Sequence, residues 1–83
     1  MPLYMDVHEN VRGLTPEKIA EAHKRDLEKQ GQYDVHYHKY WFNEKEGRVF
    51  CLVEAPSKEA AERVHREANG MVADRIYEIK EGL

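Results

Sequence analysis

The sequence has few cysteines and no long apolar segment. Its single cysteine, Cys51, has no partner for a disulfide within the chain, and no Cys-x-x-Cys motif is present to build a thiolate zinc cage. No apolar run approaches the roughly 20 residues that a membrane-spanning helix needs, and no charged segment precedes a hydrophobic one as in a secretory signal. We therefore expect a cytoplasmic protein with no membrane partner.

A basic stripe is also missing from the sequence. The 83 residues carry a formal net charge of −3, and acidic and basic side chains are interspersed along the whole chain. Because binding to phosphates needs clustered Lys and Arg, this pattern argues against a nucleic-acid partner. The chain also has no repeats, linkers or low-complexity segments, so residues 1–83 are expected to form a single domain.

Hydrophobic periodicity and helix caps predict the order strand, helix, strand, strand, helix, strand. Thr15 and Ser57 are expected to cap the two helices, which end near Gly31 and Gly70. The strands are expected at residues 3–9, 34–42, 48–55 and 74–80. This order is typical of the ferredoxin-like βαββαβ fold, an α+β architecture in which both helices cover one face of a four-stranded antiparallel sheet.

The other face of such a sheet must meet water, a ligand or a second subunit. A chain of this size buries only about 60% of its unfolded surface, so a monomer would be marginally stable. We therefore expect a homodimer of the α+β barrel type, in which the open faces of two sheets are paired. On the first strand, alternation is expected to turn one set of side chains toward the helices, Leu3, Met5 and Val7, and the other set toward the open face, Tyr4, Asp6 and His8.

Two of the five histidines, His36 and His38, lie two residues apart in an aromatic-rich strand. At ~3.3 Å per residue, they start roughly 6.6 Å apart on one face, which also carries Tyr40, and this is close enough to converge on one ion. Imidazole and carboxylate ligands suit nickel, zinc, copper and iron. The sequence therefore predicts a metal site on the open face, with the candidate ligands His36, His38, His8, Asp6 and Glu54.

Other reactive residues have plainer explanations. His23 and His65, one on each predicted helix, offer a second metal site, with Asp26 three residues from His23, but a partly buried histidine bonded to a backbone group or a carboxylate is the commoner arrangement. Pro2 is more often a tolerated residue at the start of a strand than a catalytic N-terminal amine like that of the tautomerases. Cys51, in an apolar strand, is expected to be an inert packing residue.

Two alternatives to a metal-binding protein stay open. The first is a cofactor-independent enzyme of the dimeric α+β barrel type, with a histidine as general base in the cavity between paired sheets. A substrate-sized apolar pocket beside a histidine would favour this enzyme. The second is an interaction module with incidental histidines, which would dimerise without taking up metal. A non-enzymatic protein is the preferred hypothesis.

Four segments resemble a known family: Met1–Glu9, Lys39–Glu44, Val49–Ser57 and Val64–Ala68. They are similar to the small nickel-binding proteins with a ferredoxin-like fold, whose domain has no assigned function. The similarity extends over nearly the whole chain. It implies a homodimer that binds nickel near the dimer surface, with sequestration of the metal as its role.

Two positions depart from the pattern of that family. His38 stands where relatives often have an apolar residue, and Asn69 stands where a histidine is common. The extra histidine favours a site on the strand, whereas the missing one weakens a site near the second helix. The leading hypothesis is therefore a homodimer that sequesters or buffers a divalent metal ion, with nickel chosen by the resemblance.

Overall fold

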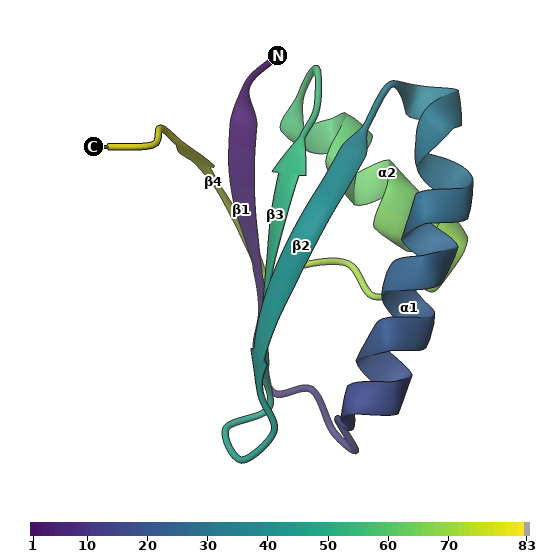
Figure 1. Cartoon of the computed structure of the whole chain (residues 1–83), viewed down its shortest axis with the longest axis vertical. Helices are drawn as coiled ribbons and strands as arrows, with labels where there is room; N and C mark the ends of the chain where they lie inside the picture. The colour runs from purple at the N-terminus through teal and green to yellow at the C-terminus, as the bar shows by residue number, and fades with distance from the viewer. Residues whose placement is uncertain (83) are drawn as a thin grey trace.

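The computed structural model describes residues 1–82 and shows a four-stranded sheet with both helices on one side (Figure 1). The elements are β1 (Leu3–His8), α1 (Pro16–Lys29), the 3-10 helix η1 (Gln30–Tyr33), β2 (His36–Asn43), β3 (Arg48–Glu54), α2 (Lys58–Ala68) and β4 (Arg75–Ile79). The strands lie in the order β2-β3-β1-β4, and all neighbours are antiparallel. The predicted ferredoxin-like α+β fold is confirmed.

The helices begin at the predicted caps. The side chains of Thr15 and Ser57 each accept a hydrogen bond of 3.2 Å from the backbone amide three residues further on. After α2 the chain turns at Gly70, which has a φ of +76° and donates its amide to the carbonyl of His65 at 2.8 Å. Within residues 1–82, neither helix has the length and hydropathy needed to cross a bilayer.

On β1 the polar side chains, and not the apolar ones, face the helices. Tyr4, Asp6 and His8 are buried, with 5%, 0% and 4% of their surface exposed. The residues between them are only half-buried and lie on the open face. The prediction that the helices cover the apolar face of this strand is therefore wrong. Alternation shows that the strand has two different faces but does not reveal which of them the helices cover. This reversal applies equally to the apolar set, Leu3, Met5 and Val7.

A β-bulge in β2 changes the alternation of the aromatic segment. Between Tyr37 and Lys39 the pairing with β3 slips, so that His38 is the extra residue. Tyr37, before the bulge, is buried under the helices, whereas Lys39, after it, is exposed, with its Nζ 5.5 Å from the ring centroid of Trp41. The expectation that Tyr40 shares a face with His38 is wrong, since the Tyr40 ring packs 4.9 Å from a histidine of α1.

The core lies between the sheet and the two helices. Its fully buried valines are Val35, Val49, Val53 and Val64. Helix α1 contributes Ile19 and Asp26 to this core. Leu27, the next residue of α1, is 44% exposed. A carboxylate thus lies in the core while the neighbouring leucine faces solvent.

The hairpin between β2 and β3 depends on Gly47. Its φ is +67°, and a Cβ added there would lie 2.9 Å from the carbonyl oxygen of Val11. We expect Gly47→Ala to lower the free energy of unfolding by about 2 kcal/mol, because both backbone strain and a backbone clash oppose the methyl group. Urea denaturation measures this loss.

The matched control is Gly31→Ala. Gly31 has no positive φ, and a Cβ there meets nothing within 4 Å. We expect this variant to be unchanged or slightly stabilised. Equal losses of stability in the two variants would contradict the role given to Gly47.

Candidate metal centre

Four potential metal ligands meet in the core. Asp6 and His8 come from β1, Cys51 from β3 and His65 from α2, and these four residues are named here the buried cluster. One ligand atom from each lies within 4.8 Å of the ligand atoms of the other three, and all four residues are buried. In the part of the chain that the structure describes, no other group of three or more His, Cys, Asp or Glu residues comes together in this way.

Strand register and helix position explain how the cluster forms. Asp6 on β1 is directly opposite Cys51 on β3, so their side chains leave the sheet on the same face. His8 follows two residues after Asp6 and therefore shares that face. The ring of His65 reaches this face from α2, with its centroid 5.0 Å from that of His8. Three elements that are distant in sequence thus supply one site.

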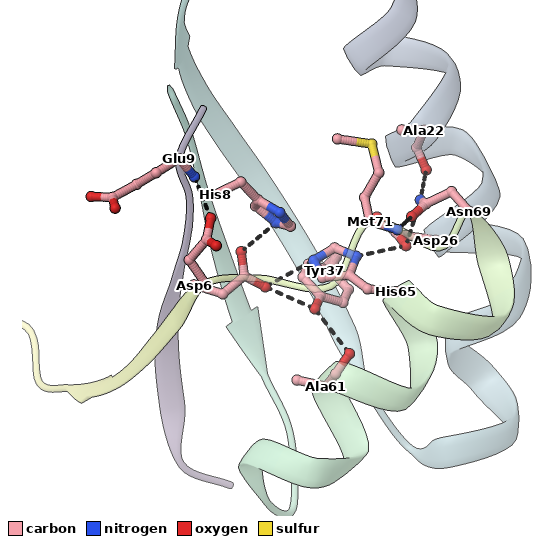
Figure 2. Close-up of polar contacts among 11 residues, drawn as sticks. Asp6, His8, Glu9, Ala22, Asp26, Tyr37, Ala61, His65, Asn69 and Met71 are labelled. Atoms are coloured by element: carbon pink, nitrogen blue, oxygen red, sulfur yellow. Dashed lines mark hydrogen bonds and ion pairs between the residues drawn. The ribbon is translucent and has the colours of Figure 1, made fainter. Parts of the chain in front are cut away.

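His65 is held between two carboxylates (Figure 2). Its Nε2 lies 2.8 Å from Oδ2 of Asp6, and its Nδ1 lies 3.0 Å from Oδ1 of Asp26. Because an ionised carboxylate can only accept, both ring nitrogens donate and the ring is an imidazolium. Burial alone would lower the pKa of His65, but the hydrogen bonds and charges of Asp26 and Asp6 raise it to about 9.

Further hydrogen bonds fix both carboxylates in place. The hydroxyl of Tyr37 donates to Oδ2 of Asp6 at 2.9 Å and also lies 3.1 Å from the carbonyl oxygen of Ala61. Asn69 donates to Oδ1 of Asp26 at 3.2 Å. Burial, together with the charge of Asp6, raises the pKa of Tyr37, so this hydroxyl keeps its proton. The network connects β1 and β2 to both helices.

Asp6 has one buried oxygen, Oδ1, with no hydrogen-bond partner. Nε2 of His8 lies 3.3 Å away, but it is not oriented to form a hydrogen bond. Burial would raise the pKa of Asp6, yet the neighbouring His65 and His8 lower it well below its usual range. Asp6 is therefore a buried carboxylate ion with one unsatisfied oxygen, which is costly unless a cation or a donor occupies that position.

The donors of the buried cluster fit a divalent first-row metal ion. Imidazole nitrogen, carboxylate oxygen and thiolate sulfur are all ligands of nickel, zinc and copper. Two ligands on opposite sides of an ion are separated by about 4–4.6 Å, so donor atoms that lie within 4.8 Å of one another need to move little. The bond from Nδ1 of His65 to Asp26 matches the way carboxylates orient metal-binding histidines.

Cys51 would bind such an ion only as a thiolate. Burial raises the pKa of the Cys51 thiol, and the nearby charge of Asp6 raises it further. The thiol therefore keeps its proton in the metal-free protein, which makes it slow to react as long as water and reagents are excluded from it. A metal ion would have to displace that proton.

The sheet separates the five predicted ligands into two groups. Asp6 and His8 belong to the buried cluster, whereas His36 and His38 are exposed and Glu54 is half-buried on the open face. Nε2 of His38 lies 2.7 Å from Oε1 of Glu54, and His36 pairs with Glu54 in the strand register. These three residues, named here the surface group, do not converge with Asp6 and His8. Metal binding by the surface group stays a prediction.

Two residues of the buried cluster lie outside the predicted ligand set. Cys51 is predicted to be a packing residue, and only its pairing opposite Asp6, which the sequence alone does not reveal, places it at the site. His65 is predicted to bond a carboxylate, and its bonds to Asp26 and Asp6 confirm this. His23 is instead half-buried beside Tyr40, and burial lowers its pKa.

Comparison with known proteins gives two matches over nearly the whole chain. A family model described as nickel responsive protein SCO4226-like matches residues 4–79. The crystal structure of SCO4226 from Streptomyces coelicolor A3(2) has a TM-score of 0.91 and 37% sequence identity, covering 98% of this chain and 99% of that chain. No curated protein matches the chain.

The metal-free protein should become less stable as pH rises, because His65 then loses the proton that binds it to Asp6 and Asp26. The folded-state pKa of about 9 exceeds the ordinary value of 6.5, so the stabilisation is complete below pH 6.5 and is lost as pH rises through 9. We expect the free energy of unfolding to fall by about 1.4 kcal/mol per pH unit in this window. Urea denaturation at pH 6.5, 7.5 and 8.5, with chelator present, measures the slope.

The control for this prediction is His65→Gln, which removes the titrating group. We expect this variant to be less stable and to lack the slope. A proton NMR titration of the His65 ring in the wild-type protein should show an imidazolium at pH 8. A slope that is equal in both proteins would contradict the assignment.

Proposed function

We propose that this chain, which belongs to the SCO4226-like family of nickel-responsive proteins, binds divalent nickel in the buried cluster and so sequesters or buffers the ion. One observation carries the proposal: Oδ1 of Asp6 is buried without a hydrogen-bond partner beside three other ligand side chains. A cation at this point would give that oxygen a partner. It would also offset the excess negative charge of two buried carboxylates, Asp6 and Asp26, around one imidazolium.

Each residue of the cluster has a distinct part in the proposal. His8 and His65 offer imidazole nitrogens, Cys51 offers a thiolate, and Asp6 offers a carboxylate oxygen that neutralises charge. Asp26 keeps its hydrogen bond to Nδ1 of His65 and so orients that ring. Nickel is cargo in this proposal, so the residues serve to hold it and not to promote a reaction.

The surface group remains a separate proposal for a second, weaker site. The contact between His38 and Glu54 brings one imidazole and one carboxylate together, and His36 lies beside them. The exposure of both histidines gives a bound ion little protection from water. We therefore place the main site in the buried cluster.

A pair of variants distinguishes the two locations. We expect Cys51→Ser to weaken nickel binding at pH 7.5 by roughly 10- to 100-fold or more, because a hydroxyl does not replace a thiolate ligand. His36→Ala/His38→Ala, with the buried cluster intact, should bind with unchanged affinity and stoichiometry. Isothermal titration of the untagged proteins measures both quantities.

The opposite outcome would relocate the site. If Cys51→Ser binds like the wild type and the double variant loses binding, the surface group holds the ion. If neither variant changes binding, nickel is held elsewhere. Circular dichroism of both variants verifies that the fold is intact in each comparison.

The open face of the sheet supports a homodimer as part of the proposal. No helix covers this face (Figure 1), and its central positions on β1 and β3 are apolar. Trp41 and Tyr77 are 46% and 48% exposed on it. The half-buried apolar residues beside them are Leu3, Met5, Val7, Phe50 and Leu52. A contiguous apolar patch of this kind marks an interface, and a two-fold dimer would pair the face with itself.

A charge at the centre of this face should separate the subunits. Leu52 lies on β3 between Met5 and Lys39 of the neighbouring strands. We expect sedimentation equilibrium to give twice the chain mass of 9.8 kDa for the wild type and the single mass for Leu52→Lys, since the lysine would be buried unpaired. Lys24→Glu, on the exposed side of α1, should remain dimeric. A dimeric Leu52→Lys variant would contradict the interface.

No observation in the described residues favours the enzyme alternative. The cavity beside His8 and His65 has a volume of about 10 Å³, which is room for about one water molecule and not for a substrate. The cavity between two paired sheets that the enzyme hypothesis requires lies outside a single chain. The cytoplasmic location stays a prediction.

A further inference from the structure

The small cavity beside the buried cluster ends at Met71. Three members of the cluster, His8, Cys51 and His65, line the cavity, and Met71 lines it from the segment between α2 and β4. Figure 2 shows the side chain of Met71 running between the strand that carries His8 and the helix that carries Ala22. A small solute that moves between the cavity and solvent along the segment after α2 must pass Met71 or its immediate neighbours.

Two surface grooves lie on the outer side of the same wall. The larger, about 350 Å³, runs along α1 and includes Met71, Asn69 and Ala22 in its lining. The smaller, about 100 Å³, lies beside the loop before α1 and includes Met71 and Ile19. Of all the residues that line the cavity and the two grooves, only Met71 is common to all three. Its side chain therefore lies where the cavity adjoins both grooves.

The other parts of this wall are held more firmly than Met71. Asn69 donates hydrogen bonds to the carbonyl of Ala22 at 3.1 Å and to Asp26, and it accepts the amide of Met71 at 2.9 Å. Ile19 is buried and β-branched, which restricts its rotamers. The unbranched thioether chain of Met71 is attached at a fixed backbone point but is free to change rotamer. Of these three wall residues, Met71 thus has the side chain that changes rotamer most easily.

We propose that the side chain of Met71 is the gate of the buried cluster. Its rotation opens and closes the route between the groove along α1 and the cavity beside Cys51. The gate acts on any small solute, and its role in the passage of nickel rests on the proposed function. Met71 sets the rate of uptake and release and not the stoichiometry, since it lies outside the ligand set.

Cys51 provides a test that needs no metal. It is the only cysteine in the chain and it lines the cavity, so the rate of its modification by methyl methanethiosulfonate reports how readily water and reagent reach it from solvent. We expect Met71→Ala to accelerate this reaction in the metal-free protein by at least roughly tenfold, because truncation opens the wall. Met71→Leu conserves the volume of the side chain and should react at nearly the wild-type rate. Mass spectrometry follows the reaction.

Two controls separate the gate from other causes of faster labelling. Val72→Ala changes the adjacent residue, which is 38% exposed and does not line the cavity or either groove. It should leave the rate unchanged. Val35→Ala truncates a fully buried residue just before β2 that does not line the cavity, so it reports labelling through unfolding. If Val35→Ala is labelled as fast as Met71→Ala at equal free energy of unfolding, or if Met71→Ala matches the wild type, the gate is overturned.

Nickel uptake gives the second arm of the experiment. In stopped-flow mixing with nickel alone, Met71→Ala should take up and release the ion faster than the wild type and Met71→Leu, at unchanged stoichiometry. If nickel binds but Cys51 labelling is not accelerated in Met71→Ala, the gate fails while the proposed function stands. If labelling is accelerated but the wild type binds no nickel, the proposed function fails while the gate stands.

Discussion

The fold depends on a buried chain of charges in which Asp6, His65 and Asp26 connect the sheet to both helices. The two bonds of the His65 ring, 2.8 Å and 3.0 Å long, join β1 to α2 and α2 to α1. Each of these residues is at most 3% exposed. Removal of His65 would leave two carboxylates without a counterpart in the core, and removal of either carboxylate would leave a ring N–H of His65 without its acceptor. More than half of the apolar core around them consists of valines and alanines, and the buried polar network adds directional contacts that such side chains lack.

This network also creates the site. Two carboxylates surround one imidazolium, and one oxygen of Asp6 has no partner, so the core carries a negative charge that protein groups do not fully satisfy. His8 and Cys51 stand beside that oxygen with further lone pairs. A bound cation would replace the proton on Nε2 of His65 while leaving the bond to Asp26 in place. The groups that order the metal-free protein would therefore be the groups that hold the ion.

The fold could be predicted from the sequence because its signals are local. Thr15, Ser57 and Gly70 mark helix ends through the geometry of their own backbone and side chains, and strand periodicity sets the order of elements. The site could be predicted only in part. Asp6 and His8 were identifiable as ligand types, but which face of β1 the helices cover is a tertiary property. The bulge at His38 and the pairing of Cys51 with Asp6 depend on β3, which no pattern within a single strand reveals.

X-ray absorption at the nickel edge of the untagged, nickel-loaded protein tests the buried site most directly, because a histidine tag would bind nickel itself. Cys51 contributes the single sulfur that distinguishes the buried cluster from the surface group of histidines and a glutamate. We expect one sulfur neighbour together with nitrogen and oxygen neighbours around each nickel ion. A spectrum with nitrogen and oxygen neighbours and no sulfur would contradict the site.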